Sequence, residues 1–127
     1  MKKLVTAATT LVAVSAALAV SAPAAQAQGG GYYGAIATGN NGRWAIVNNY
    51  NGFQEAEGAA VRTCGHGSCS VLLSWRNGCA VLVARKNPRS TTWQASSRSN
   101  YGAARDAALS RLAGSHVVTW RCTNGYS

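Results

Sequence analysis

Four cysteines and two histidines have the widest chemical repertoire in this chain of 127 residues, and their spacing limits what they can do. Three cysteines and one histidine lie in the stretch CGHGSCSVLLSWRNGC, residues 64–79, while His116 and Cys122 lie nearer the C-terminus. Such residues can bind a metal ion, supply a reactive thiol beside a base, or form structural disulfides. Each of these three kinds of chemistry points to a different class of protein.

The cysteine spacing disfavours a zinc site. Structural zinc sites combine two close pairs of ligands, whereas Cys64 and Cys69 form one C-x4-C pair, and Cys79 and Cys122 are far apart. A catalytic thiol would need a thiolate that escapes oxidation. The sequence contains no metal-binding or cofactor-binding motif, so we predict no metal, no cofactor and two disulfides.

An acid–base enzyme would need residues that converge on one cleft. Glu55 and Glu57 are two residues apart on a predicted helix, so their side chains diverge around it. Nothing in the spacing brings either histidine to a glutamate. We therefore predict no catalytic residues, although an enzyme would draw on this set: His66, His116, Glu55, Glu57 and Asp106.

The N-terminus has the features of a secretory signal peptide, residues 1–27. A positively charged start precedes an apolar run over residues 4–20, and Ala25-Gln26-Ala27 suits signal peptidase. We predict a flexible mature N-terminus over residues 28–31 and a single domain over residues 32–127. The mature protein would then have no transmembrane anchor and would be secreted or held in the cell envelope, where disulfides persist.

The predicted domain reads as one β-β-α-β unit written twice. Short runs rich in β-branched and aromatic residues, bounded by Gly, Asn and Pro, predict strands, and apolar residues at i, i+3/i+4 spacing predict helices. We expect an α+β fold in which an antiparallel sheet carries two helices. The predicted strands are 32–38, 44–50, 69–75, 79–85, 91–96 and 116–122, and the predicted helices are 53–63 and 101–113.

Aromatic residues recur in the same order in the two copies. Tryptophans at corresponding strand positions usually fill a core, so we expect those of this chain to be buried; the alternative is that exposed rings, with Tyr32 and Tyr33, stack on bases or sugars. The matched positions are Trp44 with Trp93, Phe53 with Tyr101, and Trp75 with Trp120.

Local signals place the turns and the helix starts. Asn41-Gly42 is a strong hairpin signal, because both residues tolerate the positive φ that a tight turn requires. Asn51 is expected to cap the first helix, and Asn100 or Ser99 the second, by accepting a hydrogen bond from a backbone N–H.

Comparison of the copies indicates how the cysteines pair. Four cysteines permit three pairings, and spacing alone does not choose among them. The second copy has no cysteine where the first has Cys64 and Cys69, and cysteines that are absent together are expected to be bonded together. We therefore predict the disulfides Cys64–Cys69 and Cys79–Cys122.

The whole pattern resembles a known family. YGAIA, NGRWA, a helix ending in Cys64, RNGCAVL and a final VVTWRC are similar to a family of small secreted bacterial domains of unknown function, found in actinobacteria, including mycobacteria, and in some proteobacteria. The likeness spans residues 32–122. It departs at Tyr33, where typical members have tryptophan, and in the second copy, where they have a further cysteine pair. The resemblance implies export and a two-copy α+β domain, and brings no catalytic motif.

The chain is strongly basic, with 12 Lys and Arg against 3 Asp and Glu and a net charge of +9. Loss of two lysines with the signal peptide leaves +7, of which +1 falls in residues 28–77 and +6 in residues 78–127. A one-sided basic surface attracts polyanions, and the arginine fork suits phosphate and carboxylate. The candidate anion-binding residues are Arg85, Lys86, Arg89 and Arg98.

These features favour a monomer that binds, without catalysis, an anionic envelope polymer, a lipid headgroup or an acidic protein. Nucleic acid is compatible with the charge, but no motif supports it. Three alternatives remain open: the charge only keeps the protein soluble, the protein is an inhibitor or immunity-type protein against an envelope-active enzyme, or it is a small secreted hydrolase such as a ribonuclease.

Overall fold

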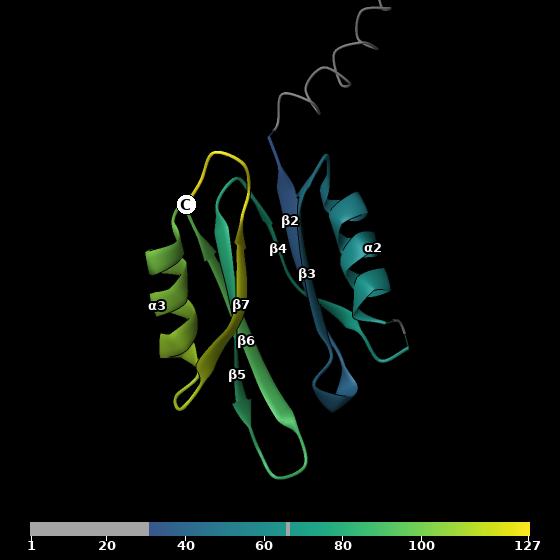
Figure 1. Ribbon diagram of the computed structural model, residues 1–127, viewed down its shortest axis with the longest axis vertical. Helices are drawn as coiled ribbons and strands as arrows, with labels where there is room; N and C mark the ends of the chain where they lie inside the picture. The colour runs from purple at the N-terminus through teal and green to yellow at the C-terminus, as the bar shows by residue number, and fades with distance from the viewer. Residues whose placement is uncertain (1–30, 66) are drawn as a thin grey trace, which may run out of the picture. The chain divides into compact units, whose positions relative to one another are not determined.

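The computed structural model describes residues 31–65 and 67–127. The predicted signal peptide, residues 28–30 of the predicted flexible N-terminus, and His66 lie outside the described residues. Within them, the order β-β-α-β occurs twice, as predicted, and the α+β fold is confirmed (Figure 1). The first copy contains β2 (Tyr33–Thr38), β3 (Trp44–Tyr50), α2 (Phe53–Cys64) and β4 (Ser70–Arg76), and the second contains β5 (Cys79–Lys86), β6 (Thr91–Arg98), α3 (Tyr101–Arg111) and β7 (His116–Cys122).

Each copy forms a sheet of its own. The strand orders are β3-β2-β4 and β6-β5-β7, and every pairing is antiparallel. The sequence predicts an antiparallel sheet, and the structure divides its strands between two. The physical reason is that β2 and β5 each pair on both sides with strands of their own copy. Neither central strand therefore has an edge free to pair with a strand of the other copy.

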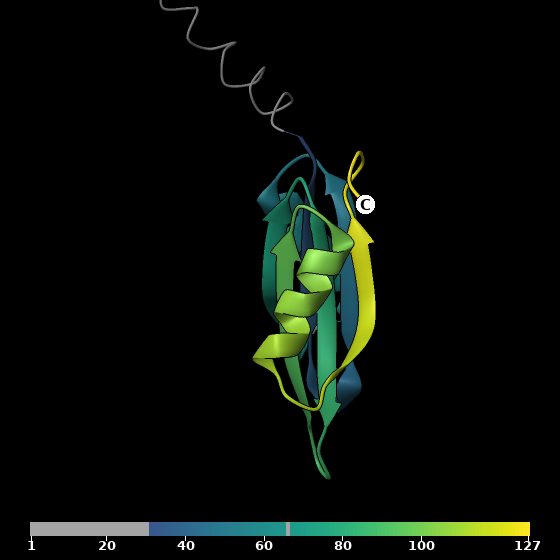
Figure 2. The ribbon, with the colours of Figure 1, turned by 90° about the vertical axis from the view of Figure 1, so that its left-hand side faces the viewer.

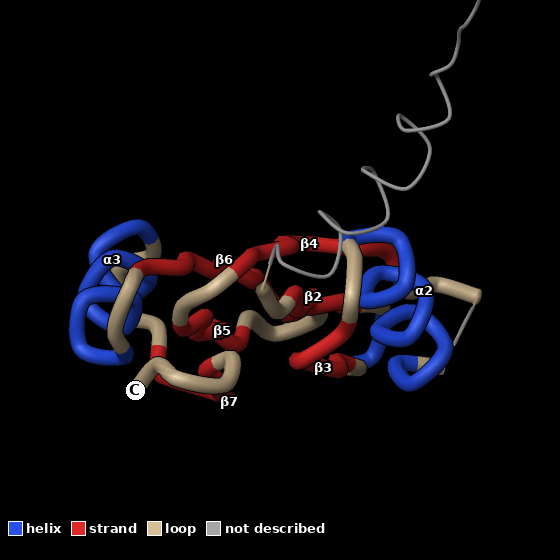
Figure 3. Tube along the Cα trace, turned by 90° about the horizontal axis from the view of Figure 1, so that it is seen from above, coloured by secondary structure: helices blue, strands red, loops and turns tan. Residues whose placement is uncertain are grey.

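The two sheets pack face to face, with one helix on each outer face (Figures 1 and 3). Ile36 from β2 and Leu82 from β5 are fully buried between the sheets, and Trp75 from β4 joins them. Strand β3 lies beside β7, and β4 lies beside β6 (Figure 3). The result is four layers, α2, sheet, sheet and α3, with the largest apolar side chains in the middle.

Small residues line the helix–sheet contacts. Ala56 and Ala60 of α2 pack on Ala35 and Ala37 of β2, and the two alanines Ala104 and Ala108 of α3 pack on the valines of β5. Side chains this short let each helix lie close to its sheet. Helix α2 lies mainly over β2 and β3. Helix α3 lies mainly over β5 and β6, and Figure 2 shows it in front of these strands. The outer faces of β4 and β7 are therefore less covered.

The prediction that the matched tryptophans fill the core is wrong for Trp44 and Trp120, which are 41% and 45% exposed. Trp93 is half-buried against the inter-sheet core, whereas Trp75 is 3% exposed. In the sheets Trp75 pairs with Gly34, the second residue of β2, and Trp120 pairs with the third residue of β5. The sequence match is thus offset by one residue, and such a shift moves a side chain to the other face of a sheet.

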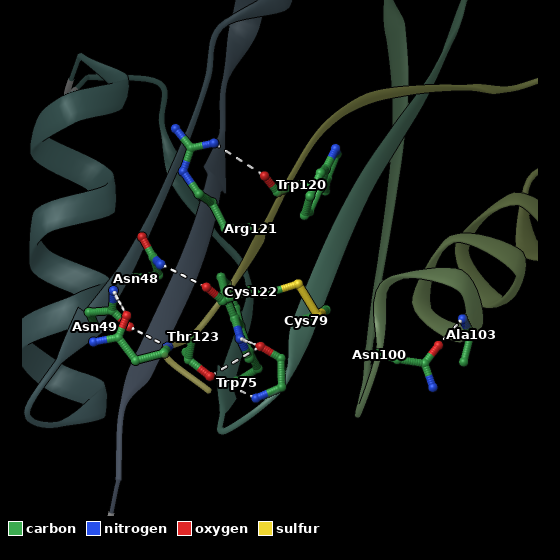
Figure 4. The surroundings of a disulfide bond; sticks show 12 residues. Asn48, Asn49, Trp75, Cys79, Asn100, Ala103, Trp120, Arg121, Cys122 and Thr123 are labelled. Atoms are coloured by element: carbon green, nitrogen blue, oxygen red, sulfur yellow. Dashed lines mark hydrogen bonds between the residues drawn. A yellow bond between two sulfur atoms is a disulfide. The ribbon is translucent and has the colours of Figure 1, made fainter. Parts of the chain in front are cut away.

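The turn between the copies is fixed by polar contacts and by a disulfide (Figure 4). Thr123, which is buried, accepts a hydrogen bond from the N–H of Gly78 at 2.8 Å, and the indole N–H of Trp75 donates to the Gly78 carbonyl at 3.0 Å. The disulfide Cys79–Cys122 joins β5 to the end of β7 next to this turn. The junction therefore couples the last strand of each copy to the start of β5.

The helix starts differ in how they are capped. Asn100 caps α3 as predicted, because its side chain accepts a hydrogen bond from the N–H of Ala103 at 2.8 Å. The predicted cap Asn51 is wrong: Gly52 occupies the N-cap of α2 and makes no side-chain cap hydrogen bond. Asn51 lies one residue too early, since a capping oxygen must come from the residue directly before the helix.

We predict that Asn100→Ala lowers the free energy of unfolding by about 1 kcal/mol, because the Ala103 N–H loses its acceptor. Urea denaturation measures the change. Asn51→Ala is the matched control and should change stability by less than about 0.5 kcal/mol. Equal losses in the two variants would contradict this assignment of the cap.

Candidate functional site

Five basic residues gather where the hairpins turn and helix α3 ends, at the lower end in Figure 1. This basic end is formed by residues from both copies. Antiparallel hairpins return to the same edge of a sheet, and both helices run toward this edge, so residues far apart in sequence meet here. Arg62 is in the last turn of α2, but its guanidinium turns back along the helix toward Gly58, into a depression that Glu55 also lines, so it does not belong to the basic end. The members are Arg43 after the β2–β3 turn, Arg85 and Lys86 at the end of β5, Arg89 in the β5–β6 loop, and Arg111 in the last turn of α3.

The three acidic residues of the chain lie elsewhere. Glu55 and Glu57 are in the first half of α2, and Asp106 is in the middle of α3. The formal charge of the basic end is therefore +5, out of +7 for residues 31–127. The sequence places the excess charge in the second half of the chain, whereas the fold concentrates it at one end of both copies.

A groove runs across the basic end between the β2–β3 turn and the β5–β6 loop. It contains two adjoining cavities of about 340 and 330 Å³. Both are lined by Asn41 and Gly42 on one side and by residues 89–91 on the other, and Lys86 lines the larger. The walls thus combine cationic side chains with amide and hydroxyl groups, which suits a ligand that is anionic and rich in hydrogen-bonding oxygens.

The β5–β6 loop is braced by its own residues. The N–H of Asn87 donates to the Ser90 carbonyl at 2.8 Å, and the Asn87 side-chain amide donates to the Thr92 hydroxyl at 2.8 Å. Pro88 restricts the backbone between them. Lys86 and Arg89 therefore extend from a loop whose backbone is already ordered.

The opposite wall is held by the β2–β3 turn. Asn41 and Gly42 have φ values of 63° and 74°, which confirms the predicted positive-φ turn. The disulfide Cys64–Cys69 closes the loop that follows α2, and this loop meets the turn twice. The N–H of Asn40 donates to the Ser68 hydroxyl at 3.0 Å, and the Arg43 guanidinium donates to the Gly65 carbonyl at 3.3 Å; this disulfide thus supports one wall of the groove.

The structure brings together three of the four predicted anion-binding residues. Lys86 and Arg89 line the groove, and Arg85 lies beside them with its guanidinium donating to the Ala113 carbonyl at 2.9 Å. Arg98 pairs with Cys79 at the other end of β6, eight residues along the strand, and does not belong to the basic end.

Two members of the basic end do not follow from the charge pattern of the sequence: Arg43 and Arg111. Arg111 could have been found from its place in the last turn of a predicted helix, where the helix dipole favours a cation. The position of Arg43 depends on the geometry of the β2–β3 turn, and nothing in the sequence indicates it.

The possible catalytic residues lie toward different ends of the domain. His116 begins β7 at the basic end and is exposed. Glu57 accepts a hydrogen bond from the Ser74 hydroxyl, near the far end of β4. In residues 31–65 and 67–127, no group of three or more His, Cys, Asp or Glu side chains is placed to hold a metal ion. Likewise, no helix in this part of the chain is long and apolar enough to span a membrane.

These features define a small, basic, disulfide-bonded α+β domain made of two β-β-α-β copies packed sheet to sheet. The sequence matches the family described as Domain of unknown function (DUF4189) over residues 33–122. This range begins with β2 and ends with the last residue of β7, so it covers both copies. The chain belongs to this family, in agreement with the resemblance seen in its sequence.

Mycobacterial relatives show the same extent of similarity. Protein Rv1269c of Mycobacterium tuberculosis is 37% identical over 90 residues, which cover 71% of this chain and 68% of the relative. Protein Mb1300c of Mycobacterium bovis gives the same values. Their names state no activity. No solved structure matches this chain.

Proposed function

We propose that this protein binds an anionic polymer of the cell envelope through its basic end, outside the cytoplasm and without catalysing a reaction. One observation carries the proposal: five basic residues from both copies meet at one end of the fold, and the three acidic residues of the chain lie elsewhere. Cations held close together repel one another, and a polyanion relieves that repulsion while it is attracted to the site.

The placement of the charges favours an extended ligand over a small one. Arg111 ends the outer layer α3, and Arg43 follows the β2–β3 turn of the other copy. Lys86 and Arg89 line the groove between the hairpin turns. One small anion cannot contact charges spread over this width. A polymer with regularly repeated phosphate or carboxylate groups can contact several of them, and the arginine forks suit both groups.

The two disulfides support a location outside the cytoplasm. Disulfides persist in oxidising compartments and are rare in the reducing cytosol. Both are built into the fold, and Cys64–Cys69 supports one wall of the groove. A protein exported in this form would meet the anionic polymers and lipids of the envelope before other ligands.

The test compares two charge-reversal variants with the same net charge. Lys86→Glu/Arg89→Glu alters the basic end, and Arg98→Glu/Arg121→Glu makes the same change of charge at the other end. We predict that the first variant binds a glycerol-phosphate teichoic acid about 10- to 100-fold more weakly than the unaltered protein at low salt, and that the control changes less than about threefold. Isothermal titration calorimetry of the disulfide-bonded protein gives both affinities.

Binding should also weaken steeply between about 0.05 and 0.5 M salt, because screening shortens the reach of surface charges. Equal losses in the two variants would show that only net charge matters and would overturn the assignment to the basic end. Absence of binding by the unaltered protein at low salt would overturn the proposed function itself.

A further inference from the structure

A tryptophan on the outer face of β7 is exposed beside a tyrosine. Trp120 is 45% exposed, and the centres of its ring and the Tyr101 ring lie 4.6 Å apart at an interplanar angle of 46°. Helix α3, which begins with Tyr101, lies mainly over β5 and β6, so it leaves the indole on β7 at the surface. A depression of about 450 Å³ follows β7 at residues 118–122.

The backbone that carries this indole is fixed. Trp120 pairs with Val81 in the centre of the sheet, and the disulfide Cys79–Cys122 joins the same two strands two residues away. In Figure 4 the Trp120 side chain lies on one side of β7, and that of Arg121 on the other, toward β3. The ring is therefore presented by a rigid strand, and a ligand that stacks on it pays little ordering entropy.

An arginine lies next to the tyrosine of this pair and binds an aspartate. The Arg105 guanidinium is 5.5 Å from the centre of the Tyr101 ring, and its Nη2 is 3.1 Å from the Asp106 carboxylate. The hydrogen bond to Asp106 raises the pKa of Arg105 above its ordinary value, so the guanidinium keeps its charge. Arg105 thus presents N–H donors beside Tyr101, and Asp106 presents acceptor oxygens beside Arg105.

The side chains around Trp120 favour a sugar over a nucleotide, although both kinds of ligand stack on aromatic rings. A nucleotide brings a phosphate, but the charge of Arg105 is balanced by Asp106, and Trp120 is four residues, roughly 13 Å, along β7 from the start of the strand at the basic end. A sugar ring brings hydroxyls, each of which both donates and accepts. Its C–H groups also suit the negative face of an indole.

We propose that Trp120, Tyr101 and the Arg105–Asp106 pair form a binding site for an uncharged sugar ring. The ring would stack on Trp120, with hydroxyls donating to Asp106 and accepting from Arg105. This site is separate from the basic end and does not depend on the proposed function.

The test uses the intact, disulfide-bonded protein labelled with 15N and three uncharged probes: cellohexaose, maltohexaose and hexa-N-acetylchitohexaose. At least one probe should shift the indole N–H resonance of Trp120 in a saturable way. Trp120→Ala should weaken that binding at least about tenfold, and Trp44→Ala, which removes a tryptophan of similar exposure, should leave it unchanged. Asp106→Ala, at an exposed helix position, gives a second weakened variant in which both rings remain.

The effect of salt on affinity distinguishes binding at this site from binding at the basic end. The sugar affinity should be the same at low salt and at about 0.5 M salt, because no net charge is neutralised on binding. The proposed site would be overturned if none of the three probes showed saturable binding, or if the Trp120→Ala variant bound them as well as the unaltered protein. A shift of Trp120 by a single-stranded oligothymidylate but by no hexasaccharide would also overturn it, in favour of base stacking.

Discussion

Replacing Cys79 and Cys122 together by alanine is expected to lower the free energy of unfolding by about 4 kcal/mol, the largest loss we predict for any single crosslink in this protein. The bond closes a loop with a sequence separation of 43 and joins β5 directly to the end of β7. In the chain-entropy picture, opening so long a loop greatly enlarges the unfolded ensemble. Since the free energy of unfolding of a domain is only about 5–15 kcal/mol, the midpoint of urea denaturation should move to a much lower urea concentration.

The matched control is the Cys64→Ala/Cys69→Ala variant, which opens a loop with a sequence separation of 5. The same picture gives a loss of about 2 kcal/mol for it. A smaller loss for the long loop than for the short one would contradict the entropic argument. The control has a second use. This bond supports the groove wall that the β2–β3 turn forms, and Arg43 follows that turn. Teichoic acid binding should therefore weaken even in the folded variant.

Trp75→Ala is expected to cost about 3–5 kcal/mol, the range for truncating a buried aromatic side chain. Trp75 is 3% exposed between the sheets, and its ring packs against Gly34, where an added Cβ would come within 2.4 Å of the indole. The variant would open a cavity and also remove the hydrogen bond to the Gly78 carbonyl. Both effects act on the junction between the copies.

Trp44→Ala is the matched control, with the same chemical change at a position that is 41% exposed. It should cost about 1 kcal/mol or less, because little apolar surface is lost from the interior. Denaturant titration of both variants gives the comparison. Similar losses would contradict the view that Trp75 packs between the sheets whereas Trp44 lies at the surface.

Much of the fold could be predicted from the sequence because it is encoded locally. The strands 44–50 and 116–122 begin and end where the pattern of β-branched and aromatic residues places them. The positive-φ turn at Asn41-Gly42 and the cap at Asn100 depend on a few neighbouring residues. These features do not require knowledge of which elements pack together.

Strand register is less local, and here the sequence comparison failed. In both copies the pairing of the central strand with the last strand shifts by one residue, between Ile36 and Ala37 and between Leu82 and Val83. The extra residue in each last strand is a β-bulge. The bulge stands at the same place in both copies, so it does not distinguish them. What differs is that Trp120 pairs one position later along its central strand than Trp75 does, which puts Trp120 on the outer face.

The candidate site was predictable only in part. Lys86 ends β5 and Arg89 lies in the loop that follows, so these two neighbours in sequence could be identified together. Arg98 seemed to belong with them because it carries the same charge nearby in the chain. An eight-residue strand separates it from the loop, and a strand of this length places its two ends on opposite sides of a small domain.

The sequence by itself determined the strand and helix order, the two-copy repeat and the excess of arginine over acidic residues, because composition and short-range spacing specify these features. The tertiary structure alone decided that each copy closes its own sheet, that Trp120 faces solvent, and that five basic residues share one end. The physical reason is that residues as distant as Arg43 and Arg111 become neighbours only when antiparallel strands and helices all end at the same edge.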